Sequence, residues 1–113
     1  MAQRQPMDFR ALQDEVTAWR KHNFPKADSA SQFKGVVEEL GELAHADLKH
    51  GQKIRSGEGD YYLKKMDAVG DMIIFLLNYC DLEGLDFEGS VKFAWSEASK
   101  RDWIKFPKNG VNE

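Results

Sequence analysis

The chain has 113 residues, of which 42% are hydrophobic and 31% charged, and its formal net charge is −3. This length gives one domain with a core of useful size, and the composition is ordinary for a soluble globular protein. The acidic balance, with no run of more than two Lys or Arg residues, excludes an extended nucleic-acid-binding surface.

The cellular compartment is indicated by cysteine content and by the apolar runs. Cys80 is the only cysteine, so no internal disulfide can form, and its place at the end of an apolar run favours a buried structural thiol. The longest apolar run, 72–77, is far too short to cross a bilayer. The first ten residues lack the apolar core of a signal peptide. We therefore expect a cytoplasmic protein with no membrane partner.

Apolar residues recur every three or four positions in four segments, and no segment shows the alternation of a strand. The first expected helix starts at a cap, Asp8, and ends before Pro25, because the residue before a proline is pushed away from helical geometry. Trp19 on this helix is either a core residue or a stacking surface for a base. The second helix runs from about 31 to 49, with its cap within 28–31. The predicted class is all-α, a bundle of four to five helices.

The third expected helix, about 61–82, contains the run 72–77, which is apolar on every side. Such a helix must be surrounded, and a chain of this size has few helices with which to surround it. We therefore expect a second copy to complete the core, in a homodimer or homotetramer. The fourth helix starts after a cap at Asp86 and continues to about Trp103. The single domain spans 1–113, with flexible tails expected at 1–7 and 107–113.

Residues 50–60 contain three glycines and no helical periodicity, which predicts a loop. The basic residues near this loop allow two interpretations, a solvated surface or a phosphate-binding cluster. The glycine spacing matches neither a P-loop nor a dinucleotide-binding fingerprint. The cations considered for binding the phosphates of a substrate are Lys49, Lys53, Arg55 and Arg101.

Carboxylates are concentrated on the second and third expected helices. Each helical residue turns by about 100°, so Glu38, Glu39 and Glu42 share one face of the second helix. Asp67 and Asp71 share one face of the third for the same reason. Few basic residues lie among these carboxylates.

The acidic stripe of the third helix crosses the most hydrophobic segment of the protein. Asp71 and Asn78 lie within about 20° of each other on the helix, and every residue between them is apolar. Buried carboxylates without partners are costly or protonated. Two interpretations compete: both acidic stripes face solvent, or they face each other and hold a divalent cation. An oxygen-rich site of this kind suits Mg²⁺, with Mn²⁺ as an alternative.

A third interpretation comes from the two Glu-x-x-His-like motifs of the second helix. Glu42 and His45 have the spacing found in di-iron bundles, and Asp47 and His50 imitate it. Di-iron sites take this motif from two separate helices, whereas both examples here share one, which argues against iron. His45 and His50 are therefore considered as substrate contacts or surface residues.

The segments that carry the two acidic stripes resemble the all-α nucleotide pyrophosphohydrolases of the MazG type. Residues 38–43, EELGEL, match the E-E-x-x-E pattern of that family. On the next helix, residues 70–71, GD, are followed seven positions after the aspartate by Asn78. The resemblance covers about residues 33–103 and is closest to the small stand-alone MazG-like proteins.

This resemblance implies Mg²⁺-dependent hydrolysis of a (deoxy)nucleoside triphosphate between the α and β phosphates, giving the monophosphate and pyrophosphate. It matches Glu39, Glu42 and Asp71 to metal ligands at the catalytic centre. Glu38 matches an extra acidic position, either a ligand or a residue that orients the attacking water. Asn78 matches an asparagine on the inner face of the second acidic helix and is expected to bind the substrate.

One position departs from the family pattern, which has a glutamate three residues before the aspartate. This chain has Ala68 there, and Asp67 lies one residue earlier. Asp67 shares a helix face with Asp71 and is expected to reach the metal site with a shorter arm. The number of metal ions in the site depends on this residue.

The competing class of function is a non-catalytic helical oligomer, an interaction or regulatory module whose acidic stripes are structural.

Overall fold

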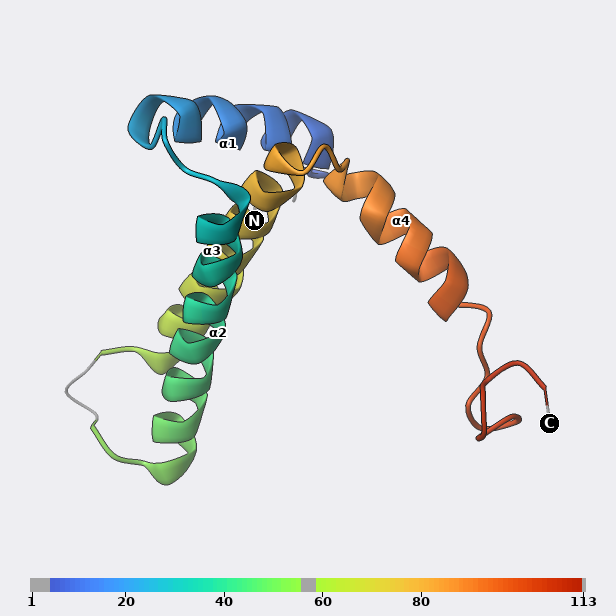
Figure 1. Ribbon diagram of the computed structural model, residues 1–113. Helices are drawn as coiled ribbons and strands as arrows, with labels where there is room; N and C mark the ends of the chain where they lie inside the picture. The colour runs from blue at the N-terminus through green and yellow to red at the C-terminus, as the bar shows by residue number, and fades with distance from the viewer. Residues whose placement is uncertain (1–4, 56–58, 113) are drawn as a thin grey trace.

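The computed structural model describes residues 5–55 and 59–112, which form four helices and, within these ranges, no strand (Figure 1). Expected features at residues 1–4, 56–58 and 113, in the two tails and the glycine-rich loop, lie outside the described residues. The predicted all-α class is confirmed. No helix in the described ranges has the length and apolar character needed to cross a membrane. The helices are α1 (Phe9–Asn23), α2 (Ser29–Gln52), α3 (Tyr61–Leu82) and α4 (Phe87–Ala98).

An aspartate caps the amino terminus of every one of these helices. Its carboxylate accepts hydrogen bonds from backbone N–H groups of the first turn, which have no partner within the helix. At the start of α2, the Asp28 carboxylate accepts from the Ser31 N–H at 2.8 Å, and the Ser31 hydroxyl accepts from the Asp28 N–H at 3.3 Å. The bond from the Ser31 N–H is the largest cause that holds the pKa of Asp28 below its usual value. The four caps are Asp8, Asp28, Asp60 and Asp86.

The end of α4 differs from the expectation. The helix ends at Ala98 rather than near Trp103, because the Asp102 carboxylate accepts from two following backbone N–H groups, at 3.1 and 2.9 Å, and turns the chain. The Asp102 N–H then donates to the Gly110 carbonyl at 2.7 Å. Residues 107–112, expected within a flexible tail, therefore belong to a segment that folds back on itself.

Helices α2 and α3 lie side by side along their length, α1 crosses one end of this pair, and α4 projects away from it (Figure 1). The core lies where α1 crosses α3 and meets the start of α4. Val16, Leu77 and Phe87 pack there with Cys80, which is buried as expected. Burial raises the pKa of the Cys80 thiol. The core is thus confined to one end of the molecule.

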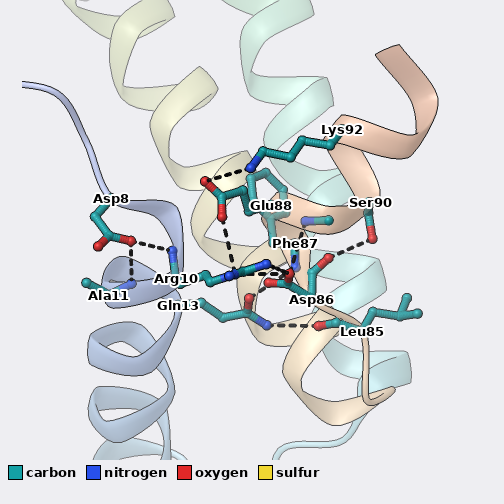
Figure 2. Close-up of polar contacts among 11 residues, drawn as sticks. Asp8, Arg10, Ala11, Gln13, Leu85, Asp86, Phe87, Glu88, Ser90 and Lys92 are labelled. Carbon is teal, nitrogen blue, oxygen red and sulfur yellow. Dashed lines mark hydrogen bonds and ion pairs between the residues drawn. The ribbon is translucent and has the colours of Figure 1, made fainter. Parts of the chain in front are cut away.

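Polar contacts fix the start of α4 to α1 (Figure 2). The buried Gln13 amide donates to the Leu85 carbonyl at 3.0 Å and accepts from the Phe87 N–H at 3.1 Å. At the surface, the Arg10 guanidinium donates to the Asp86 carboxylate at 3.0 Å. Gln13 therefore satisfies two backbone groups at the junction between α3 and α4.

Replacing Gln13 with Ala is expected to lower the free energy of unfolding by about 1–3 kcal/mol, because a buried N–H and a partly buried carbonyl lose their partners. Urea unfolding followed by circular dichroism measures the change. The matched control is Asp14→Ala, an exposed neighbour, for which we expect a change within about 0.5 kcal/mol. Equal midpoints for the two variants would contradict the role given to Gln13.

The surface is large for a chain of this mass. Its accessible area is 8990 Å² and its radius of gyration 17.9 Å. A compact monomer of this size has roughly 6,300 Å² and 13 Å. Within the apolar run of α3, Leu77 is fully buried but Ile74 stays 38% exposed. Apolar side chains that are at least half exposed include Val37, Leu40, Leu48, Met66, Val69, Val91, Phe93 and Trp95.

Candidate functional site

Two cavities lie against the α2–α3 pair, and they share two lining residues, Glu39 and Asp71. The larger, about 860 Å³, is the aromatic cavity, lined by Trp19, Arg20, Phe24, Pro25, Lys26, Ala27, Ser31, Gln32, Glu39, Asp71, Ile74, Phe75 and Asn78. The smaller, about 480 Å³, is the acidic cavity, lined by Glu38, Glu39, Glu42, His45, Ala46, Lys64, Asp67, Ala68 and Asp71. Every carboxylate predicted for the metal site therefore lines the same cavity.

Small side chains let α2 and α3 approach each other beside the acidic cavity. Ala46 and Ala68, one from each helix, are 2% and 3% exposed. At Gly35 of α2, an added Cβ would overlap the ring of Phe75 on α3, so this glycine is required for the close packing. Gly41 has no neighbour that a Cβ would meet. Close approach explains one of the three glycines inside α2.

The position that departs from the family pattern faces the acidic cavity. Ala68 lines the cavity beside Asp67 and Asp71. Ala68 itself is buried, whereas Asp67 is exposed and Asp71 partly buried. The Asp67 charge is near enough to raise the pKa of both Glu39 and Asp71. Asp67 thus belongs to the carboxylate cluster despite its shift by one position.

Repulsion among these carboxylates accompanies their partial burial. Desolvation is the largest cause that raises the pKa of Glu39, followed by the charges of Asp71, Glu38, Glu42 and Asp67. The pKa of Asp71 is raised by desolvation and then by Asp67. A bound cation would relieve both effects, because it favours the ionised form of every neighbouring carboxylate.

The donor set of the acidic cavity suits a hard cation. It consists of five carboxylates and the single imidazole of His45, and oxygen ligands are those that Mg²⁺ and Mn²⁺ prefer. Among the described residues, no three His, Cys, Asp or Glu side chains converge in metal-binding geometry, so the carboxylates surround a space rather than a point. His50 stacks on Tyr61, with ring centroids 5.7 Å apart, and does not line this cavity. The observed donor set is consistent with the argument against di-iron.

Replacing Glu39 with Gln is expected to raise the melting temperature of the metal-free protein at pH 7 by a few degrees. A raised carboxyl pKa means that the fold favours the protonated group, so this contribution to stability is present below the ordinary pKa and lost as pH rises through the folded value. At pH 7 the charge is therefore destabilising, and Gln removes it. Thermal melts in EDTA at pH 7 and pH 4 measure the change, which should shrink at the lower pH. A lower melting temperature for the variant at pH 7 would contradict this explanation.

Trp19 lies at the aromatic cavity, and its interpretation as a core residue is wrong. Its side chain is 53% exposed, whereas the next residue, Arg20, is only 4% exposed. Helix α1 is rotated so that Gln13, Val16 and Arg20 face the core. Trp19 meets Phe24 edge to face, with ring centroids 5.7 Å apart. The two rings offer an accessible aromatic surface.

Behind these rings lies a buried polar network that the sequence did not reveal. Arg20 Nη1 donates to the Asn78 backbone oxygen at 3.3 Å and to Asn78 Oδ1 at 3.2 Å, and Nη2 donates to Asp81 Oδ2 at 2.8 Å. The Asp81 charge compensates the buried guanidinium. Asn78 is 2% exposed and lines the cavity. The only sequence signal for Arg20 is its position four residues after Val16, on the same helix face.

The four cations considered for phosphate binding do not line either cavity. Lys49 donates to Gln52 at 3.2 Å, and Lys53 and Arg55 have left-handed backbone conformations after α2. Arg101 follows α4 and packs against Gly110. The cations that do line the cavities are Arg20 and Lys26 in the aromatic one and Lys64 in the acidic one.

Each cavity has the size of a small-molecule site, which spans roughly 300–1,000 Å³. One is acidic, and the other is aromatic with buried polar groups, so the pair suits a ligand with a cation-binding anionic part and a flat apolar part. Comparison with known proteins gave no match to a family model, a curated protein or a solved structure. The function is therefore inferred from the site and from the sequence pattern.

Proposed function

We propose that the chain is a Mg²⁺-dependent nucleoside triphosphate pyrophosphohydrolase of the MazG type. It would hydrolyse (deoxy)nucleoside triphosphates at the α–β phosphate bond, giving the monophosphate and pyrophosphate. The observation that carries this proposal is the wall shared by the two cavities, to which Glu39 and Asp71 belong. A nucleotide has the same two-part character, since its flat base is joined to a polyphosphate that binds divalent cations. With the base in the aromatic cavity and the polyphosphate in the acidic cavity, the sugar and the α-phosphate would lie beside these two carboxylates.

The residues of the acidic cavity divide into metal ligands and a base. Glu39, Glu42 and Asp71, with Asp67, would hold Mg²⁺ or Mn²⁺, which when bound supplies charge neutralisation at the phosphates and a more acidic water. Glu38 would accept the proton of the attacking water. The water oxygen bonds to one phosphorus of the α–β linkage, and the bond from that phosphorus to the bridging oxygen breaks. Monophosphate and pyrophosphate are the products.

The remaining lining residues are assigned to substrate binding. The base would stack on Trp19 beside Phe24, at the aromatic cavity. His45 and Lys64 line the acidic cavity and would contact the phosphates. Lys64 is a better candidate for this role than the four cations outside the cavities.

We further propose that the enzyme is a cytoplasmic homodimer or homotetramer, with neither a nucleic acid nor a membrane as partner. Its accessible area of 8990 Å² exceeds that of a compact monomer by roughly 2,700 Å². Obligate homodimers bury about 1,000–2,500 Å² of each chain. The excess is thus of the size that a second copy would cover. Helix α4, whose exposed apolar residues include Val91 and Trp95, would be part of this interface.

The enzymatic proposal is tested with a panel of ribo- and deoxyribonucleoside triphosphates in the presence of Mg²⁺. We expect pyrophosphate release from at least one of them, and loss of this release in Glu42→Gln. Absence of pyrophosphate from every substrate would refute the proposal. Equal rates for Glu42→Gln and the unchanged protein would refute the role of the acidic cavity.

A non-catalytic oligomeric module is the second candidate function, and the exposed apolar faces of the helices favour it. Thermal melts separate the two candidates. A cation that binds the acidic cavity raises the melting temperature as its concentration exceeds its dissociation constant. A melting temperature that does not respond to Mg²⁺ or Mn²⁺ would favour the module.

A further inference from the structure

The chemistry of Arg20 fixes the orientation of the Asn78 side-chain amide. A guanidinium has only hydrogen-bond donors, so the amide atom that faces Arg20 Nη1 at 3.2 Å must be the oxygen. The second bond from Nη1, to the Asn78 backbone oxygen, prevents the guanidinium from turning away. The bond from Nη2 to Asp81 holds the other end of the fork. The NH₂ group of Asn78 is therefore directed away from Arg20.

This NH₂ group is available to a ligand. Within the described part of the chain it donates no hydrogen bond, although Asn78 is 2% exposed. The one described side-chain atom that is both completely buried and unpartnered is Thr17 Oγ1, so the Asn78 nitrogen keeps some accessible surface. Because Asn78 lines the aromatic cavity, that surface faces the cavity. The site thus contains a fixed donor without a partner.

Gln32 offers the complementary group. The Ser31 hydroxyl gives its proton to the Asp28 carbonyl at 2.8 Å, so its oxygen can only accept from Gln32. Gln32 Nε2 therefore donates to Ser31 Oγ at 3.3 Å, and Gln32 Oε1 is left as an acceptor. Gln32 is 7% exposed and lines the same cavity. The cavity presents one oriented donor and one oriented acceptor beside Trp19.

We infer that Arg20 is a positioning residue that holds the Asn78 amide for recognition of a nucleobase edge, with Gln32 as the second contact. This inference rests on the proposed function, since it names the part of the nucleotide that enters the aromatic cavity. Every base has an acceptor next to a donor on its pairing edge, and keto and amino bases carry them in opposite order. Fixed amides can therefore distinguish a keto base from an amino base.

The test uses Asn78→Asp, which keeps an acceptor for Arg20 and replaces the free donor with a second acceptor of the same shape. Two substrate pairs, dUTP with dCTP and dITP with dATP, differ in the order of donor and acceptor. We expect the ratio of kcat/KM within each pair to change by about tenfold, in the same direction for both pairs. A shift of the ratio toward the amino bases means that Asn78 contacts the exocyclic group of the base. A shift toward the keto bases means that Asn78 contacts the ring nitrogen. Unchanged ratios would overturn the inference.

The positioning role of Arg20 is tested with Arg20→Met, which frees the Asn78 amide to rotate. In Arg20→Met the ratio of kcat/KM within each substrate pair should move toward one. Arg20→Lys, which keeps a donor-only group, should restore part of the discrimination between the two substrates. A purely structural role would lower kcat/KM for all substrates equally and leave the ratios unchanged, which would contradict the inference. Lys21→Met is the matched control, since it removes a neighbouring but exposed cation. If Arg20→Met does not fold, Arg20→Lys and Asn78→Asp decide.

Binding measurements separate this inference from the proposed reaction. Calorimetric titration with dUMP and dCMP needs no hydrolysis, so it remains informative if no triphosphate is cleaved. We expect the ratio of the two dissociation constants to change in Asn78→Asp as the kinetic ratio does. Absence of binding of either monophosphate to the unchanged protein would overturn the assignment of the aromatic cavity to a base. Hydrolysis with unchanged ratios would overturn the inference alone.

Discussion

Glu39→Gln is expected to lower the rate of pyrophosphate release by about 100-fold or more, the largest effect of any single change in the acidic cavity. The substitution keeps the size and the hydrogen-bonding oxygen of the side chain but removes its charge. Glu39 lines both cavities, and four other carboxylates act on its pKa, so it lies at the electrostatic centre of the cluster. A steady-state pyrophosphate assay at saturating Mg²⁺ measures the loss.

The control for this experiment is Glu15→Gln, which makes the same chemical change at an exposed position of α1 outside both cavities. Its rate should equal that of the unchanged protein. The metal-free melting temperature of Glu39→Gln is expected to rise, so inactivity in a protein that melts at a higher temperature cannot be ascribed to unfolding. A rate within about threefold of the unchanged protein would contradict the role assigned to Glu39.

Trp95→Asp is expected to convert the assembly into a monomer at micromolar concentration. Trp95 is 68% exposed in the single chain, and Val91 and Ala98 share its helix face. Burying the unpaired charge of an aspartate in a subunit interface costs several kcal/mol, which is a large part of the free energy of association. Light scattering coupled to size-exclusion chromatography gives the mass in solution.

Ser96→Asp is the matched control, because it adds the same charge about 100° around α4 from Trp95, away from the face of Val91 and Ala98. It should keep the oligomeric mass of the unchanged protein. A monomeric mass for the unchanged protein would refute the assembly proposal. Equal oligomeric masses for all three proteins would show that α4 is not in the interface.

The sequence predicted the helices well because local chemistry sets their ends. Aspartates stand at all four starts, and Pro25 lies just beyond the end of α1. The end of α4 was missed because apolar residues continue at helical spacing to Trp103, while the carboxylate of Asp102 competes for the backbone N–H groups. Spacing predicts which residues share a face, but it does not predict this local competition.

The site was predicted in part for a similar reason. The shared faces of Glu38, Glu39 and Glu42 follow from helix geometry, and so does their approach to Asp71 once α2 and α3 pair. The rotation of α1, by contrast, depends on its packing against α3. Trp19 and Arg20 are adjacent, and only tertiary contacts decide which of the two is buried. A charged residue on an apolar face is an ambiguous signal until its partner, here Asp81, is known.

The attachment of α4 by its first turn alone has a consequence for folding kinetics. A free helix of 12 residues is only marginally stable in water, and residues 90–100 are exposed along its length. In the dissociated chain, the amide hydrogens of α4 should therefore exchange with solvent far faster than those of α3. The rate at which the α4 amide hydrogens become protected would depend on protein concentration, because two chains must meet first. The rate at which α1 pairs with α3 would not depend on concentration, because both helices belong to one chain. Hydrogen exchange at several protein concentrations would follow the two steps separately along one chain.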